Sequence, residues 1–318
     1  MSDRWILSSS PHLHSGHSTT RIMGDVLIAL IPAVIASFVL FGWRALVVET
    51  VCVASCMAAE YLSCRVMKKP NSTGDLSCMV TGLLLAMNLP VSIPLWQAVF
   101  GCVTSIVVAK MMFGGLGQNF VNPALVGRIV LTGSFPGDMN TWTHPFAWLG
   151  RAADGVSSAT PLAMLKNGEI VAERYSIWDL LLGNRTGSLG ETCALALILG
   201  GAYLLVRRVI SPAIPLCFIG TVSVLALLCG ENPVYHLLGG GLMIGAFFMA
   251  TDYVTSPITT SGKILYAVGC GALTMLIRLG GSLPEGVSFA IVIMNITVPL
   301  IERITKPRPF GAERRVRR

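Results

Sequence analysis

The chain has 318 residues, of which 53% are hydrophobic and only 12% are charged, and its mean hydropathy is +0.70. A water-soluble domain cannot bury that much apolar surface, so the composition excludes a soluble enzyme and indicates a membrane protein. The net charge of +7 is also compatible with nucleic-acid binding. Lys and Arg lie in short loops and tails, however, and not on an amphipathic helix, which excludes that class.

Apolar stretches separated by charged or Pro/Gly-rich breaks recur along the chain. A helix needs roughly 20 apolar residues to cross the hydrocarbon core of a bilayer, so these stretches predict an all-α polytopic membrane protein with about ten transmembrane helices. The predicted spans, five in each half, lie near residues 23–42, 45–64, 76–89, 95–113, 120–134, 190–209, 213–229, 237–250, 264–279 and 285–303.

The basic residues of the loops predict the orientation. With the N-terminus in the cytoplasm, Lys68, Lys69, Arg207, Arg208 and the Arg-rich tail all fall on the cytoplasmic side, as the positive-inside rule requires. Both termini are then cytoplasmic, and the long polar loop at 135–188 is extracytoplasmic. The first twenty residues contain no apolar core ahead of a cleavage site, so we expect no cleaved signal peptide.

Matched Gly-rich breaks relate the two groups of five spans. Lys110 is followed by glycines at 114, 115 and 117, and Arg278 is followed by Gly280 and Gly281. Two five-helix halves of opposite orientation form an inverted repeat, in which broken or short helices at matched positions indicate a binding site. We therefore divide the chain into a cytoplasmic N-terminal segment (1–22), a first five-helix repeat (23–134), an extracytoplasmic loop (135–188), a second five-helix repeat (189–304) and a basic cytoplasmic tail (305–318).

A second matched pair of breaks follows two short apolar segments, which end at Asn88 just before Pro90 and at Asp252 just before Pro257. With Asn119 and Asn122, which follow Gly117, four polar side chains therefore lie within or beside the breaks. Free backbone N–H and C=O groups inside a bilayer must face protein, water or a ligand, so we predict that these side chains point into the helix bundle. Capping of the half-helices and contact with a ligand both remain open.

Neither the cysteines nor the histidines predict a metal site. The nine cysteines lie in apolar stretches without a CxxC pair or a Cys/His cluster, so we expect small, buried, hydrophobic side chains. His12, His14 and His17 raise the question of a metal, but we assign none to them.

The 135–188 loop contains one short motif, Asp154-Gly155-Val156-Ser157-Ser158-Ala159-Thr160, which is followed by Pro161. Taken alone, the pattern favours a turn at Asp154-Gly155 and a helix cap or solvated hydroxyl at Thr160. The motif is nevertheless similar to the acceptor signature of extracytoplasmic flavin transferases, which join FMN through its phosphate to the threonine hydroxyl.

From about residue 8 to 309, the chain resembles the NqrB/RnfD family of respiratory ion pumps. The likeness is carried by Ser10-Pro11-His12, by the run from Gly114 to Ala124 and by Ala250-Thr251-Asp252, in the family's order. Only about 22 residues precede the first predicted span. The chain therefore looks like the D subunit of the Rnf complex rather than the B subunit of the sodium-pumping NADH:quinone reductase, which has a longer N-terminal extension. Tyr253 departs from the family's usual Pro, and Ser158 stands where Gly is frequent.

The resemblance implies a membrane subunit of a complex that moves electrons from reduced ferredoxin to NAD⁺ and exports Na⁺ or H⁺. The implied cofactor is FMN on Thr160, and a second, non-covalent flavin such as riboflavin is left open. The implied contacts of the covalent flavin are the motif residues Asp154, Gly155, Ser157, Ser158 and Ala159, with Asn119 and Asn122 as further candidates. The implied partners are membrane lipid and the other Rnf subunits (A, B, C, E and G). These subunits would hold the ferredoxin and NAD sites, because this chain has no GxGxxG after a strand.

Carboxylates at membrane depth are the candidates for an ion path, because burying a charge is costly. They are Asp25, Glu60, Asp252 and Glu285. Two other functional classes remain open: a channel or transporter for a small polar solute, of urea-channel-like architecture, and a scaffold that only assembles partner subunits. A flavin acceptor at Thr160 has no use in either of these classes.

Overall fold

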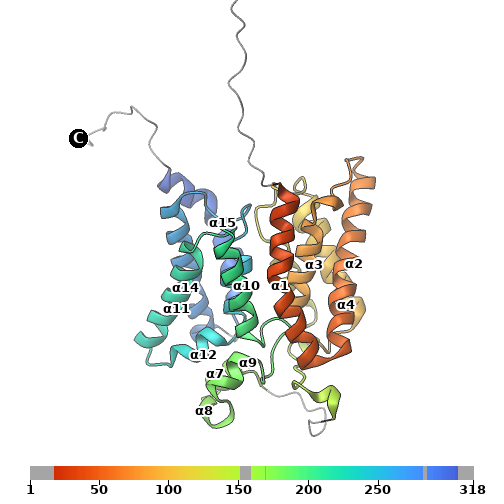
Figure 1. The fold of residues 1–318 in the computed structure, drawn as a ribbon. Helices are drawn as coiled ribbons and strands as arrows, with labels where there is room; N and C mark the ends of the chain where they lie inside the picture. Colours follow the sequence, from red (N-terminus) through yellow and green to blue (C-terminus); the bar gives the residue numbers. More distant parts are fainter. Residues whose placement is uncertain (1–17, 151–158, 169, 282–284, 307–318) are drawn as a thin grey trace, which may run out of the picture.

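The computed structural model describes residues 18–150, 159–168, 170–281 and 285–306. Within these ranges every regular element is a helix, which confirms the all-α prediction, and the helices form two groups joined by a long connection (Figure 1).

The first group begins with two long helices, α1 (Thr19–Phe41) and α2 (Trp43–Val66). A 3₁₀ turn, η1 (Thr73–Asp75), leads to the short helix α3 (Ser77–Met87). Helix α4 (Leu95–Val103) continues as a π-helical segment, η2 (Thr104–Met111), and α5 (Pro123–Ser134) ends the group.

The described part of the connection between the groups contains five short elements. They are α6 (Pro136–Met139), η3 (Ala147–Leu149), α7 (Pro161–Lys166), α8 (Val171–Arg174) and α9 (Ile177–Leu182).

The second group repeats the order of the first. It contains α10 (Ala194–Val206), α11 (Ala213–Leu228), α12 (Pro233–Leu238), α13 (Leu242–Ile244), the π-helical segment η4 (Gly245–Met249), α14 (Thr260–Gly280) and α15 (Val287–Thr305). Each predicted span overlaps a helical segment, although several ends differ by three or four residues: α1 begins at Thr19 and not at 23, α10 begins at Ala194 and not at 190, and α14 begins at Thr260 and not at 264. Two further differences have a clear local cause. The fifth helix begins at Pro123 and not at 120, because Asn122 caps it. The eighth span is broken at Gly239–Gly241 into α12 and α13, because Gly240 and Gly241 both adopt positive φ angles.

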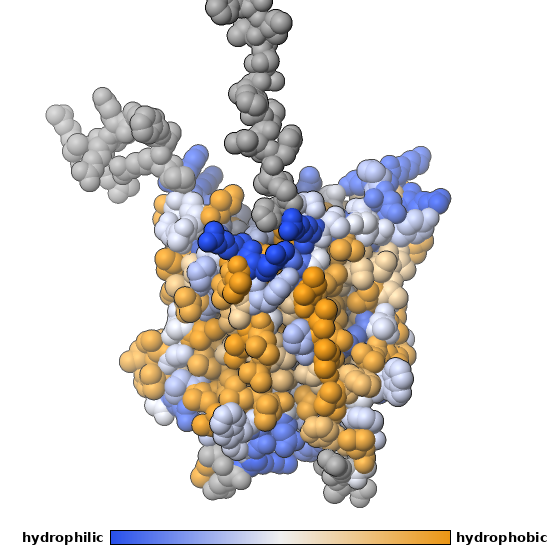
Figure 2. Space-filling view, in the orientation of Figure 1, coloured by the Kyte–Doolittle hydropathy of each residue, from blue (hydrophilic) through white to orange (hydrophobic). Residues whose placement is uncertain are grey.

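The lengths of the helices fit a membrane protein with broken spans. Among the described residues, α1, α2, α14 and α15 are long and apolar enough to cross a membrane by themselves. Helix α3 has 11 residues, which at a rise of about 1.5 Å per residue reaches only about half of the roughly 30 Å hydrocarbon core. On the face shown in Figure 2, apolar side chains form a broad band between two more hydrophilic ends.

The two groups have the same internal arrangement. Helix α2 packs against α3 and α4, and correspondingly α11 packs against α12 and α14. Across the interface between the groups, α1 packs against α10, and α5 packs against α15. Equivalent helices therefore meet at the centre, as the inverted-repeat prediction requires.

The two ends of the described bundle are distinguished by the helices that begin or end there. Helix α1 begins and α15 ends at the same end, which we call the terminal end (Figure 1). Helices α7, α8 and α9 lie at the opposite end, which we call the loop end. The nine cysteines are free thiols, and six of them are buried as predicted. Cys193 and Cys217 are only partly buried, and Cys229, at the end of α11, is exposed.

Helices α2 and α3 approach so closely that a glycine is required between them. A Cβ on Gly82 would lie 2.9 Å from both the Cys52 carbonyl oxygen and the Val53 Cα atom, and backbone atoms cannot move aside as a side chain can. Such direct backbone contact is the usual role of small residues between membrane helices.

We expect Gly82→Ala to lower the free energy of unfolding by about 1–3 kcal/mol, the usual cost of overpacking a core. The apparent midpoint of thermal unfolding in detergent measures it. Gly220→Ala in α11 is the matched control, because nothing lies within 4 Å of a Cβ at that position. Equal midpoints for the two variants would contradict the close contact between α2 and α3.

Candidate functional site

The candidate residues separate into two polar clusters at opposite ends of the bundle. Thr160 and Glu285 belong to the loop end. Asn119, Asn122 and Asp252 line one pocket near the terminal end, together with Lys110 and Ser77. Asp154, Gly155, Ser157, Ser158 and the three N-terminal histidines lie outside the described residues.

Thr160 is the N-cap of α7, as the sequence alone suggested. Its Oγ accepts a hydrogen bond from the Ala163 N–H at 3.3 Å, and Pro161 occupies the first helical position, where no N–H is needed. The side chain is buried, with 5% of its surface exposed. Among the described residues the hydroxyl donates no hydrogen bond, so its proton is free to be replaced.

Helix α7 is held in place on both sides. The Thr186 hydroxyl donates to the Ala159 carbonyl at 3.1 Å, and Lys166 donates to the Gly281 carbonyl. Leu162 packs on Gly239 and Gly240: a Cβ on Gly240 would lie 2.2 Å from Leu162 Cδ1, and a Cβ on Gly239 would lie 3.2 Å from Leu162 Cγ. The helix that carries Thr160 therefore packs on the break between α12 and α13. We call this break, Gly239–Gly241, the seat of α7.

Arg278 satisfies the backbone of this break. Its guanidinium donates to the carbonyl oxygens of His236 at 2.7 Å, Gly239 at 3.1 Å and Gly240 at 3.2 Å. These are the carbonyls that an interrupted helix leaves unpaired. Hydrogen bonds to a charged group contribute about 1.5–3 kcal/mol each, so Arg278 is the main support of the seat.

Two further arginines lie beside the seat. Arg128 of α5 donates to Asn88 Oδ1 at 2.6 Å and forms an ion pair with Glu285. Arg185 donates to the backbone carbonyl of Glu191 at 2.6 Å, and its Nη1 lies 3.8 Å from the Glu191 carboxylate.

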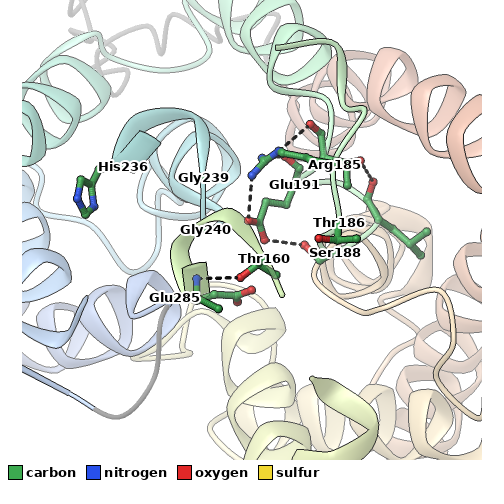
Figure 3. Close-up of polar contacts among 12 residues, drawn as sticks. Thr160, Arg185, Thr186, Ser188, Glu191, His236, Gly239, Gly240 and Glu285 are labelled. Carbon is green, nitrogen blue, oxygen red and sulfur yellow. Dashed lines mark hydrogen bonds and ion pairs between the residues drawn. The ribbon is translucent and has the colours of Figure 1, made fainter. Parts of the chain in front are cut away.

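These groups form one loop-end cluster, which we define as Arg128, Arg185, Arg278, Glu191 and Glu285. A Cβ on Gly241 would lie 3.7 Å from Arg128 Nη1 and 3.8 Å from Glu191 Oε2, so both side chains border the break. The Ser188 hydroxyl donates to Glu191 Oε2 at 3.0 Å. In Figure 3, Thr160 lies between Glu285 on one side and the Ser188–Glu191 contact on the other.

The loop-end cluster contains buried polar atoms that form no hydrogen bond with a described residue. Arg185 Nη1 and Glu285 Oε1 are buried without a hydrogen-bond partner among the described residues. Burial lowers the pKa of the Arg185 guanidinium, and the Glu191 carboxylate opposes that shift. A buried guanidinium with a spare N–H group is suited to a phosphate or another anionic ligand.

Arg128, Arg185 and Glu191 were not predicted from the sequence. Arg128 carried a usable signal, because it lies inside the predicted span 120–134, where a charge is costly. Arg185 and Glu191 lie at the end of a polar loop, and nothing in the sequence distinguishes them from solvated residues.

At the terminal end, the pocket is bordered by the start of α3, the 116–123 segment and the segment after η4. Asn122 caps α5 through the Ala124 N–H at 3.0 Å and donates to the Met249 carbonyl at 3.3 Å. Asn119 donates to the Val121 carbonyl at 3.1 Å. Both asparagines therefore support the broken backbone and also face the pocket.

Three of the four candidate carboxylates are ion-paired. Glu60 accepts from Lys110 Nζ at 2.6 Å, Asp25 lies 3.3 Å from Arg207, and Glu285 pairs with Arg128. Asp252 accepts hydrogen bonds from the Thr255 hydroxyl at 3.2 Å and the Val254 N–H at 3.4 Å. Of the four, it alone forms no ion pair with a described residue, and it borders the pocket.

The fold and these clusters define a polytopic membrane protein built from two five-helix halves, with broken helices that carry a polar site at each end. The chain belongs to the NQR2, RnfD, RnfE family, whose match covers residues 6–311.

Three relatives, each the D subunit of its complex, indicate the branch of the family. The chain is 47% identical to the D subunit of the Na⁺-translocating ferredoxin:NAD⁺ oxidoreductase complex of Acetobacterium woodii, covering 96% of this chain and 95% of that protein. It is 42% identical to the D subunit of the proton-translocating ferredoxin:NAD⁺ oxidoreductase complex of Clostridium ljungdahlii, covering 97% of this chain and 96% of that protein. It is 39% identical to the D subunit of the ion-translocating oxidoreductase complex of Stutzerimonas stutzeri, covering 94% of each protein.

The Lys110–Glu60 pair offers a test of the terminal-end site. Lys110 Nζ also donates to the Ser77 hydroxyl at 2.6 Å, and both charged side chains are almost completely buried. We expect Lys110→Met to lower stability by about 3–5 kcal/mol, because it leaves a buried carboxylate unpaired.

The double variant Lys110→Met/Glu60→Met should recover most of that loss, because two apolar side chains replace a buried pair with little net cost. Thermal unfolding of the purified chain in detergent measures both. A single variant as stable as the wild type would show that the pair does not form in the membrane protein.

Proposed function

We propose that the chain is the membrane subunit of an ion-translocating ferredoxin:NAD⁺ oxidoreductase, in which FMN bound covalently to Thr160 relays electrons. The observation that carries the proposal is the position of Thr160, whose hydroxyl donates to none of the described residues, at the start of a helix whose Leu162 packs on Gly240, against which the buried Arg278 also lies. The names of the relatives supply the reaction and the multi-subunit setting.

The residues around Thr160 fit a flavin phosphate ester. Esterification replaces the hydroxyl proton, and the ester oxygen keeps a lone pair with which to accept from the Ala163 N–H. Two arginines approach α7 through its neighbours: Arg185 precedes Thr186, whose hydroxyl donates to the Ala159 carbonyl, and Arg278 lies against Gly240, on which Leu162 packs. FMN supplies reversible electron uptake, and the protein supplies its placement and electrostatics.

The chain's own residues would hold the flavin and shield it from water. Leu162, seated on Gly239 and Gly240, closes the side of the site that faces the bundle. The covalent link keeps the cofactor at a fixed effective concentration beside the cluster, which reversible binding does not do where free FMN is scarce. Partner chains, which we propose to be the other Rnf subunits (A, B, C, E and G), would hold the ferredoxin and NAD sites.

The proposed orientation places both termini in the cytoplasm and Thr160 outside. It is supported by the common end of the bundle at which α1 begins and α15 ends, opposite α7. The basic residues Lys68, Lys69, Arg207 and Arg208 follow helices that end on the side of the termini, as the positive-inside rule requires.

We further propose that the terminal-end pocket is where a second, non-covalent flavin such as riboflavin would bind. Its lining combines aromatic side chains, Phe247, Phe248 and Tyr253, with the hydrogen-bonding groups of Asn119 and Asn122. That mixture suits a flat heteroaromatic ring with polar edges.

Thr160→Ala should abolish covalent flavin while leaving the chain folded, because only a cap worth about 1 kcal/mol is lost. Flavin fluorescence of the denatured chain in a gel, after co-expression with a flavin transferase, measures the attachment. Ferredoxin-dependent NAD⁺ reduction by the assembled complex should be lost as well.

Thr259→Ala is the matched control, because Thr259 caps α14 through the Gly262 N–H at 3.1 Å and has no role at the loop end. It should keep full fluorescence. A wild-type chain without fluorescence, purified beside a transferase proved active on another substrate, would refute the flavin proposal and favour a solute channel. Normal NAD⁺ reduction in Thr160→Ala would refute the relay.

Asp252 is the proposed contact for the coupled ion within this chain, because it borders the terminal-end pocket and has no cationic partner among the described residues. We expect Asp252→Asn to weaken the dependence of ion transport on Na⁺ or H⁺ concentration and to leave covalent flavin unchanged. Ion uptake by proteoliposomes that contain the complex measures it. An unchanged concentration dependence would exclude Asp252 from the ion path.

A further inference from the structure

The loop-end cluster is unbalanced in charge. Three buried guanidinium groups, on Arg128, Arg185 and Arg278, face two carboxylates, on Glu191 and Glu285. At the rim, Lys166 and Glu231 carry opposite charges, and Glu231 contacts His236. Among the described residues around the seat of α7, one positive charge is therefore in excess.

Of the three arginines, Arg278 is the one that forms no ion pair with a described residue. Arg128 is neutralised by Glu285, and Arg185 lies against Glu191. The polar contacts of Arg278 are with the backbone carbonyls of His236, Gly239, Gly240 and Glu285, which bear no net charge. The side chain is only 4% exposed, so water screens its charge poorly.

We infer that the loop-end cluster sets the reduction potential of the flavin on Thr160 through its net charge, with Arg128 and Glu285 as opposing determinants of that charge. The inference rests on the proposed covalent flavin. Each electron that arrives from the reduced donor adds one negative charge to the flavin unless a proton accompanies it. A nearby buried positive charge stabilises the reduced form and raises the midpoint potential.

Arg128 and Glu285 are the residues through which the charge can be changed in both directions. They lie on different halves of the protein, α5 and the segment before α15, and meet beside the break that seats α7. Neither contacts the Thr160 side chain in the structure. They act on the flavin at a distance, as positioning and electrostatic groups, and not as attachment residues.

The experiment is a spectroelectrochemical titration of the purified complex, from which the titration of the Thr160→Ala complex is subtracted to isolate the covalent flavin. Arg128→Met removes a positive charge and should lower the midpoint potential. Glu285→Gln removes a negative charge and should raise it. The double variant Arg128→Met/Glu285→Met keeps the net charge and should return the potential close to the wild-type value.

Arg207→Met is the matched control, because it removes a positive charge paired with Asp25 in the other polar cluster, at the terminal end, and should leave this potential unchanged. If Arg128→Met fails to assemble, the comparison of Glu285→Gln with the double variant carries the same test. Flavin-loaded variants that all keep the wild-type potential, or single variants that shift it in the same direction, would overturn the inference. A wild-type complex without covalent flavin would instead refute the proposed function on which it rests.

Discussion

The structure depends on one constraint, which is that backbone groups freed by a helix break inside a membrane must find partners within the protein. Three breaks meet this need in different ways. Arg278 donates to three carbonyls of the α12–α13 break, Asn122 caps α5 and reaches the Met249 carbonyl, and the Asn88 side chain donates to the Leu84 carbonyl at the end of α3. Each partner is polar because the backbone requires it. The polar sites of this protein are therefore a consequence of its broken helices.

That constraint also brings the two halves together. Asn88, on the first half, accepts from Arg128 and lies 3.8 Å from the Met249 sulfur of the second half. Arg128 in turn pairs with Glu285, close to the start of α15. A chain of polar contacts thus crosses the interface at which the broken helices of both halves meet. Lipid-facing helices could not hold such a chain, because an unpaired polar group there would cost several kcal/mol.

The sequence predicted the spans well because span length and apolar composition are local properties. It also matched Lys110 with Arg278, and the structure places both near the end of the fourth span of their halves, Lys110 against the start of the short helix α3 and Arg278 against the α12–α13 break. The partners were less predictable, because Arg128 and Glu285 are 157 positions apart and Arg128 and Asn88 are 40 apart. A single sequence gives no signal for such pairings. The proposed role of Thr160 came from a resemblance and not from its spacing or its neighbours.

Comparison of the two matched cations shows how the halves have diverged. Lys110 donates to the Glu60 carboxylate and to the Ser77 hydroxyl at the start of α3, so its charge is neutralised within the first half. Among the described residues Arg278 binds backbone carbonyls and forms no ion pair, so the support of the α12–α13 break leaves a buried positive charge at the loop end. Burying a cation without an ion pair is expensive, and backbone support alone does not require it, since the neutral side chains of Asn88 and Asn122 support the other breaks. The positive charge of Arg278 lies beside α7, the helix that carries Thr160. An anionic cofactor on Thr160 would offset the free-energy cost of burying that charge.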